Sequence, residues 1–254
     1  MHSRRHMPAT VAIIPARLGS TRFPRKILAS ATGWPLLRHV WDRARQARSL
    51  SRVVVAADDH EVLAAVQAFG GECVLTSPDH PNGTSRLAEA AATLNLRDDA
   101  LIVNVQGDEP EMDPSLIDSC VAIALTTHAD VTTAASPFAP GDDPADPNLV
   151  KVALRLDGTA LYFSRSPIPF VRAGGTGVAP LRHVGIYLYR HSFLRTYARL
   201  PPAPLEQCEM LEQLRIMEHG YTISVLQHPF FGRGVDTPAQ YAEFVDRTQR
   251  RGPP

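Results

Sequence analysis

The sequence predicts a single α/β domain over residues 1–254, with a central sheet that is mostly parallel. Short apolar runs at residues 11–14, 53–57 and 101–105 are bounded by turn residues, as expected for strands that are buried on both faces. Helical patterns alternate with these runs over residues 10–125, which indicates right-handed βαβ units. In such a sheet, ligands bind at the carboxyl ends of the strands.

Two helices follow from apolar spacing in the first half. The apolar residues at 36, 37, 40, 41 and 44 recur with a period near 3.6, and so do those at 62, 63, 66 and 69. The second pattern stops at Gly70 and Gly71, a typical end for a helix.

The second half predicts a mixed arrangement with a β-rich insertion. We expect strands near residues 131–135, 150–154, 160–163, 184–189 and 222–226. We expect helices at 191–199, 206–219 and 238–250, the second with Met210, Leu214 and Met217 along one apolar stripe. Patches rich in Pro, Gly and Asp at 137–147, 172–180 and 201–204 predict loops.

Composition excludes several classes of partner. Basic and acidic residues balance at 26 each, so bulk charge argues against nucleic acid and against a polybasic membrane surface. Three scattered cysteines without a Cys-x-x-Cys motif argue against a disulfide framework or a zinc site. There is no apolar run of about 18 residues, and residues 1–6 lack the apolar stretch of a secretory signal. We therefore expect a cytoplasmic protein.

The loop after the first predicted strand is rich in phosphate-binding groups. Arg17, Ser20 and Lys26 lie in this stretch, residues 14–26, which is neither Gly-x-Gly-x-x-Gly nor a P-loop. Lys26 and Lys151 are the only lysines in a chain with 24 arginines, so a compact ammonium stands at just two positions. A solvated basic loop is the alternative, but a loop at a strand end favours a polyphosphate site.

Two aspartates predict a site for a hard cation. Asp108 follows the strand at 101–105, and Asp236 precedes Pro238, which is suited to the first turn of a helix. Mg²⁺ prefers one or two carboxylates together with substrate phosphates. A helix N-cap is the alternative role for Asp236.

Six segments together resemble the 3-deoxy-manno-octulosonate cytidylyltransferases, the CMP-KDO synthetases. They are residues 14–26, 103–110, 161–165, 182–187, 205–215 and 234–238. They keep the family's order over residues 10 to about 245. The resemblance implies a Rossmann-like nucleotidyltransferase fold, with a nucleotide-binding half over about 10–125 and a sugar-binding and dimerisation half over about 130–245.

The resemblance also implies a reaction and a set of roles. CMP passes from CTP to the 2-hydroxyl of 3-deoxy-D-manno-octulosonate (KDO) with release of pyrophosphate, in the presence of Mg²⁺, and the product serves lipopolysaccharide-type glycan synthesis. A homodimer is implied as well. The implied catalytic residues are Arg17, Lys26, Asp108 and Asp236, with Asp108 and Asp236 as the metal ligands. The implied nucleotide contacts are Arg17, Ser20, Lys26, Asn82, Gly83, Thr84, Arg86 and Gln106. The implied sugar contacts are Gln106, Arg165, His183, Tyr187, Glu209 and Gln213.

Several alternatives stay open at this point. His183 and Tyr187 lie on one face of a strand and could form a packed, hydrogen-bonded pair. Glu209 and Gln213 could form an exposed helix face, and Lys151 could cap a strand. For the whole chain, the alternatives are a cytidylyltransferase for 8-amino-KDO or a nonulosonate, and a non-catalytic protein that binds nucleotide sugars.

The chain departs from the family pattern at two places. Arg25 stands where the family has Gly, and Ile27 where it has Pro, so we expect a stiffer loop before Lys26. Asn82 stands where Ser is common, and Ser85 where an acid is common. These changes concern the fine nucleotide contacts rather than the reaction.

Overall fold

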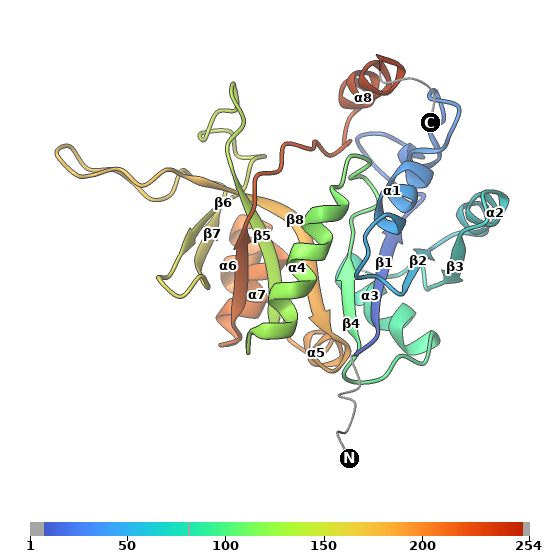
Figure 1. Cartoon of the computed structure of the whole chain (residues 1–254), viewed down its shortest axis with the longest axis horizontal. Coiled ribbons are helices and arrows are strands. Elements are labelled where there is room, and N and C mark those ends of the chain that lie inside the picture. The colour runs from blue at the N-terminus through green and yellow to red at the C-terminus, as the bar shows by residue number, and fades with distance from the viewer. Residues whose placement is uncertain (1–7, 81, 251–254) are drawn as a thin grey trace.

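The computed structural model describes residues 8–80 and 82–250 (Figure 1). The start of the chain, where we find no secretory-signal pattern, lies outside these residues, as does Pro81. Among the described helices, none is long and apolar enough to cross a membrane.

One sheet of nine strands forms the centre of the described chain, and it runs through both halves. The strands are β1 (Thr10–Ala16), β2 (Arg52–Ala57), β3 (Glu72–Leu75), β4 (Leu101–Asn104), β5 (Val131–Pro137), β6 (Lys151–Leu154), β7 (Ala160–Ser164), β8 (Leu181–Arg190) and β9 (Ile223–Gln227). Their order is β3-β2-β1-β4-β8-β5-β9, with β6 and β7 off this path. Only β8 runs antiparallel to its neighbours β4 and β5 along the path, so the predicted mostly parallel sheet is confirmed.

Helices cover both faces of the sheet. They are η1 (Lys26–Leu28), α1 (Leu36–Arg45), α2 (His60–Ala68), α3 (Gly83–Thr93), α4 (Pro114–Thr126), α5 (His191–Tyr197), α6 (Pro204–Glu209), α7 (Glu212–Glu218) and α8 (Pro238–Arg250). Apolar side chains of α1, α2 and α4 pack on one face, and those of α3, α5 and α7 pack on the other. The predicted α/β fold with a doubly covered sheet is therefore present.

The predicted β-rich insertion is the hairpin of β6 and β7 together with the long arm that follows it. The arm, residues 165–180, connects β7 to β8 and projects far from the sheet at the left of Figure 1. Phe170 on this arm is 88% exposed and Val178 is 70% exposed. Lys151 on β6 is fully buried, and its Nζ donates to the carbonyl oxygens of Asp146 and Arg165, so it holds the base of the arm.

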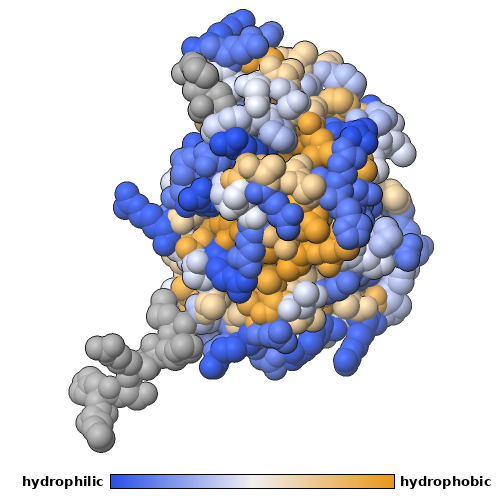
Figure 2. All heavy atoms as spheres, turned by 90° about the vertical axis from the view of Figure 1, so that its right-hand side faces the viewer, coloured by the Kyte–Doolittle hydropathy of each residue, from blue (hydrophilic) through white to orange (hydrophobic). Residues whose placement is uncertain are grey.

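At the opposite end of the sheet, β3 is the edge strand. Figure 2 faces this side and shows apolar atoms framed by hydrophilic side chains. Leu75 on β3 is 40% exposed. This strand is short, which limits pairing with another chain.

The predicted helix at 206–219 is wrong, because two helices meet at Met210. Met210 has φ 52°, in the left-handed region, and the chain turns there between α6 and α7. Its side chain is 76% exposed, so it does not belong to the apolar stripe, whereas Leu211 and Leu214 are buried. The break places the Leu211 side chain in the core. The spacing of apolar residues along the sequence does not reveal this contact.

β3, α3 and α4 are not among the elements that the sequence pattern predicts. Both helices have side-chain caps: Asn82 Oδ1 accepts the N–H of Ser85, and Asp113 Oδ1 accepts the N–H of Ser115. Asn82 and Ser85, the two residues that differ from the family pattern here, thus make the N-cap hydrogen bond of α3.

Candidate active site

A cavity of about 660 Å³ opens at the carboxyl ends of β1 and β4, as predicted. We call it the front cavity. Eight predicted site residues line it: Arg17, Ser20, Lys26, Asn82, Gly83, Gln106, Asp108 and Asp236. They come from the loop after β1, the start of α3, the turn after β4 and the segment before α8.

Lys26 joins the two aspartates at the floor of this cavity. Its Nζ lies 2.8 Å from Asp108 Oδ2, 2.8 Å from Asp236 Oδ1 and 2.9 Å from the carbonyl oxygen of Val235. Burial alone lowers the pKa of Lys26, but the two carboxylates outweigh it and raise the pKa above its usual value. Arg22 Nη2 also lies 3.1 Å from Asp236 Oδ1. The structure therefore brings together residues that are 82 and 210 positions apart in sequence.

Asp236 is not the N-cap of α8. That helix begins at Pro238, and it is the Thr237 hydroxyl that accepts the N–H of Gln240, at 3.3 Å. The carboxylate of Asp236 is turned instead to Lys26 and Arg22. The geometry thus leaves this carboxylate in the cavity, where it can meet a ligand.

A glycine sets the close approach of β1 and the turn after β4. A Cβ on Gly107 would lie 2.7 Å from the carbonyl oxygen of Pro15, so no side chain fits there. This contact holds Gln106 and Asp108 against the end of β1. The N–H of Val235 donates to the Asp108 carbonyl oxygen at 2.8 Å, which carries Asp236 to the same place.

A second, smaller cavity of about 210 Å³ adjoins the first. We call it the tyrosine pocket. Among the residues that line it are Thr84, Asn104, Gln106, Tyr187, Tyr189, Tyr197, Glu212 and Gln213. The buried Oδ1 of Asn104 has no hydrogen-bond partner among the described residues. Most of the residues that line the pocket carry a polar group on the side chain.

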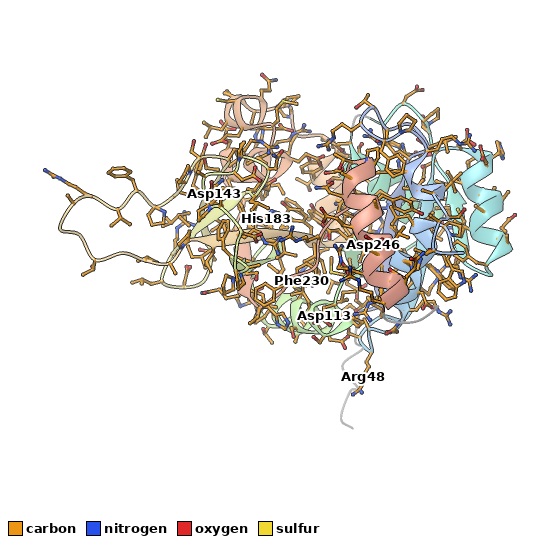
Figure 3. The ribbon with its side chains drawn as sticks, turned by 90° about the horizontal axis from the view of Figure 1, so that it is seen from above. Arg48, Asp113, Asp143, His183, Phe230 and Asp246 are labelled. Carbon is orange, nitrogen blue, oxygen red and sulfur yellow. The ribbon has the colours of Figure 1, made fainter. Side chains whose placement is uncertain are left out.

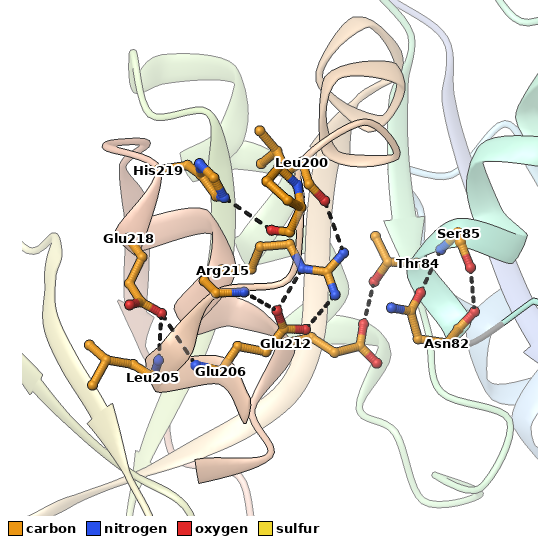
Figure 4. Close-up of polar contacts among 12 residues, drawn as sticks. Asn82, Thr84, Ser85, Leu200, Leu205, Glu206, Glu212, Arg215, Glu218 and His219 are labelled. Carbon is orange, nitrogen blue, oxygen red and sulfur yellow. Dashed lines mark hydrogen bonds and ion pairs between the residues drawn. The ribbon is translucent and has the colours of Figure 1, made fainter. Parts of the chain in front are cut away.

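Glu212 lines both cavities, and our sequence reasoning assigned it no role. Its Oε2 accepts the hydroxyl of Thr84 at 2.9 Å and so connects α7 to α3 across the pocket (Figure 4). Burial raises the pKa of this carboxyl group. The sequence does carry a signal for this residue, because Glu212 lies in the motif at 205–215.

Arg165 and Glu209 line neither cavity and bind each other. Glu209 accepts the N–H of Arg165 at 2.9 Å and the hydroxyl of Ser164 at 2.7 Å. The guanidinium of Arg165 donates to the carbonyl oxygens of Pro147, Glu209 and Met210. In this structure both side chains tie β7 to the end of α6. Glu209 also does not share a helix face with Gln213, because the break at Met210 separates them.

His183 is partly buried and packs against Tyr187, as in the alternative interpretation, but its hydrogen bond goes to Thr133 rather than to Tyr187. Figure 3 shows it among the ribbons, away from the periphery where Arg48 is labelled. Its ring centroid lies 5.1 Å from that of Phe163 and 5.3 Å from that of Tyr187, and Nε2 lies 3.0 Å from Thr133 Oγ1. Burial, with a smaller contribution from Arg182, lowers the pKa of His183 to about 3. The ring is thus neutral at ordinary pH.

Arg25 shows why the family pattern has Gly before the lysine. Its φ of 57° lies in the left-handed region, which disfavours residues with a Cβ. An ion pair with Glu61 accompanies this conformation. The expected stiffening of the loop before Lys26 therefore takes the form of a strained backbone at this position.

The match to known proteins agrees with this geometry. Residues 11–223 match the family model described as "Cytidylyltransferase". The chain belongs to the cytidylyltransferase family.

Relatives within the family support the resemblance of the six segments. A 3-deoxy-manno-octulosonate cytidylyltransferase of Syntrophobacter fumaroxidans is 50% identical over 90% of this chain and 92% of its own length. One from Acidovorax sp. is 49% identical over 92% of this chain and 95% of its own. A solved structure of CMP:2-keto-3-deoxy-manno-octonic acid synthetase complexed with CTP has a TM-score of 0.89 at 39% identity, covering 96% of this chain and 99% of that one. The predicted family resemblance and the nucleotidyltransferase fold are confirmed.

Proposed function

We propose that this cytidylyltransferase transfers CMP from CTP to the 2-hydroxyl of KDO, giving CMP-KDO and pyrophosphate. The observation that carries the proposal is the placement of Lys26, Asp108 and Asp236 together in a cavity at the strand ends. Relatives that bear the corresponding name cover nearly the whole chain. The loop at residues 14–26, which we call the phosphate loop, thus lies beside the tyrosine pocket in a member of the cytidylyltransferase family.

The front cavity supplies what displacement at a phosphorus atom requires. Such a reaction depends on alignment and charge neutralisation more than on covalent help from the protein. Arg17 and Lys26 bind the triphosphate and neutralise the departing pyrophosphate. The tyrosine pocket takes the sugar, with Gln106, Tyr187 and Gln213 as donors and acceptors for its hydroxyl groups.

We further propose that Asp108 and Asp236 hold a Mg²⁺ ion. Two carboxylates suit this ion, which completes its shell with waters and substrate oxygens. Among the described residues no group of three or more His, Cys, Asp and Glu is placed to hold a metal ion, so waters and substrate oxygens would supply the other ligands. When bound, the ion neutralises charge and lowers the pKa of a coordinated hydroxyl group. Lys26, which contacts both carboxylates, would then be available to the substrate phosphates.

Measuring pyrophosphate release tests the function. We expect release with CTP and KDO in the presence of Mg²⁺, and little with ATP, GTP or UTP. Equal activity with all four nucleotides would contradict the cytidylyl assignment. Turnover with 8-amino-KDO or a nonulosonate but not with KDO would favour a related acid sugar, and nucleotide binding without turnover would favour the non-catalytic alternative.

We also propose a homodimer in the cytoplasm, formed through the arm at 165–180. The support is the exposure of Phe170 and Val178 on a segment that projects from the sheet. Phe170→Asp should yield a monomer in analytical ultracentrifugation. The matched control is Leu156→Asp, at a fully exposed position off the arm, which should leave the dimer intact. A monomeric parent protein would overturn this proposal.

A further inference from the structure

Arg86 is one of the predicted nucleotide contacts, yet it lines neither cavity. Its side chain extends from α3 and is fully buried. Nη1 donates to Thr76 Oγ1 at 2.6 Å and to the Ser77 carbonyl oxygen at 3.1 Å. Its Nε and Nη2 have no hydrogen-bond partner among the described residues. A buried guanidinium of this kind requires a counter-charge nearby.

Asp58 is that counter-charge, and it has a second contact. Its Oδ2 lies 3.8 Å from Arg86 Nη2, and its side chain is 13% exposed. Its Oδ1 accepts the backbone N–H of Leu18 at 3.0 Å. The N–H of Asp58 in turn donates to the carbonyl oxygen of Ala16 at 3.3 Å. Asp58 therefore binds the chain at the point where β1 passes into the phosphate loop.

Leu18 stands between Arg17 and Ser20, two residues that line the front cavity. We propose that Asp58 and Arg86 are positioning residues for the triphosphate of CTP: Asp58 holds the phosphate loop through the Leu18 amide, and Arg86 holds Asp58. Neither touches the nucleotide. The proposal rests on the proposed function, because it assumes that the front cavity binds CTP.

The charges around Asp58 support this role. The positive charges of Arg17 and Arg86 repel each other, while the carboxylate of Asp58 attracts Arg86. Without this carboxylate, only the weaker attraction of Glu89 for Arg86 remains against the repulsion between the two cations, and the loop has also lost its hydrogen bond. We therefore expect the loop to shift away from the position that meets the β- and γ-phosphates.

The experiment compares binding of CTP and CMP by calorimetry, because CMP lacks the phosphates that the loop meets. In Asp58→Ala, we expect the dissociation constant of CTP to rise about tenfold, the size expected for loss of one charge-assisted hydrogen bond. CMP should change by less than about twofold. Asp58→Asn retains an acceptor for the Leu18 amide but no charge, so its effect should be smaller.

The adjacent Asp59→Asn is the matched control. Asp59 caps α2 by accepting the N–H of Glu61, a role that Asn fills equally well. This variant removes a negative charge beside the same loop without touching Leu18 or Arg86. Its affinity for CTP should equal that of the parent protein.

A double-mutant cycle with Asp58→Asn and Arg86→Met separates positioning from direct contact. If the two residues act as a unit, the double variant should be no weaker for CTP than the worse single variant. If the fold-changes of the two single variants in the dissociation constant of CTP multiply in the double variant, Arg86 acts independently of Asp58, and the proposal is overturned. Should Arg86→Met fail to fold, the two Asp58 variants decide the question alone.

Two results distinguish this inference from the proposed function. If the parent protein binds no CTP, the proposed function fails. If the parent binds CTP but Asp58→Ala binds it equally well, or loses only thermal stability, the positioning role fails while the function stands.

Discussion

At the scale of single residues, the central feature is one ammonium shared by two carboxylates. The side chain of Lys26 is 11% exposed, while those of Asp108 and Asp236 are 32% and 41% exposed. The carboxylates thus remain accessible from the cavity, whereas the lysine is enclosed. A ligand that reaches the aspartates competes directly with Lys26.

Lys26→Met should lower turnover by about 10²-fold or more, since a preorganised cation at the phosphates is lost. The same variant should bind Mg²⁺ more tightly in the absence of CTP, because no ammonium then competes for the carboxylates. Steady-state kinetics and calorimetry with Mg²⁺ check the two parts. Activity within about threefold of the parent would refute the catalytic role, and an unchanged Mg²⁺ affinity would refute the competition.

Asp236→Asn should lower turnover by roughly 10²-fold or more with little change in melting temperature, because Asn is a far poorer Mg²⁺ ligand. Raised Mg²⁺ should restore part of the loss by mass action. Thr237→Ala is the control: it removes the hydroxyl cap of α8 and should cost about 1 kcal/mol of stability while activity persists. A loss of stability in Asp236→Asn that parallels its loss of activity would make the residue structural.

At the scale of elements, the turn at Met210 decides which residues face the pocket. It ends α6 and lets α7 start in a new direction, so that Glu212 and Gln213 line the tyrosine pocket while Glu209 remains at β7. A continuous helix could not place these side chains in this way, because residues three and four apart would share one face.

Met210→Gly should stabilise the protein, because the left-handed conformation costs a residue with a Cβ about 1–2 kcal/mol. The greater freedom of glycine in the unfolded chain offsets part of this gain. We expect the melting temperature to rise by about 2 °C in total, and differential scanning calorimetry measures this change. Gln207→Gly, inside α6, is the control and should lower stability by about 1 kcal/mol. A drop of equal size in both variants would contradict the strain at Met210.

At the scale of the whole molecule, the sheet carries a partly buried, neutral histidine at the junction of β5, β7 and β8. His183 contacts Thr133 and Phe163 from two of these strands. Its pKa in the folded protein is about 3, below the 6.5 of an exposed histidine. Between these two values the unfolded chain binds more protons, so stability falls as the pH decreases through this window.

The comparison of the parent with His183→Gln checks this pH dependence. Between pH 6.5 and pH 5, we expect the parent to lose on the order of 1–2 kcal/mol more unfolding free energy than the variant. Urea unfolding at several pH values measures the difference. Parallel pH profiles for the two proteins would show that His183 does not titrate on unfolding.

The sequence by itself determined every described strand except β3, together with the loop at residues 14–26 and the family, since apolar runs and motifs are local in the chain. Lys26, Asp108 and Asp236 could be chosen because each lies at a predicted strand or helix end. Only the tertiary structure decided what depends on distant contacts: the ammonium shared by the two aspartates, the burial of Arg86, the packed state of His183 and the turn at Met210. The physical reason is that burial and ion pairing arise between segments that can be 50 to 210 residues apart, where no periodicity along the chain records them.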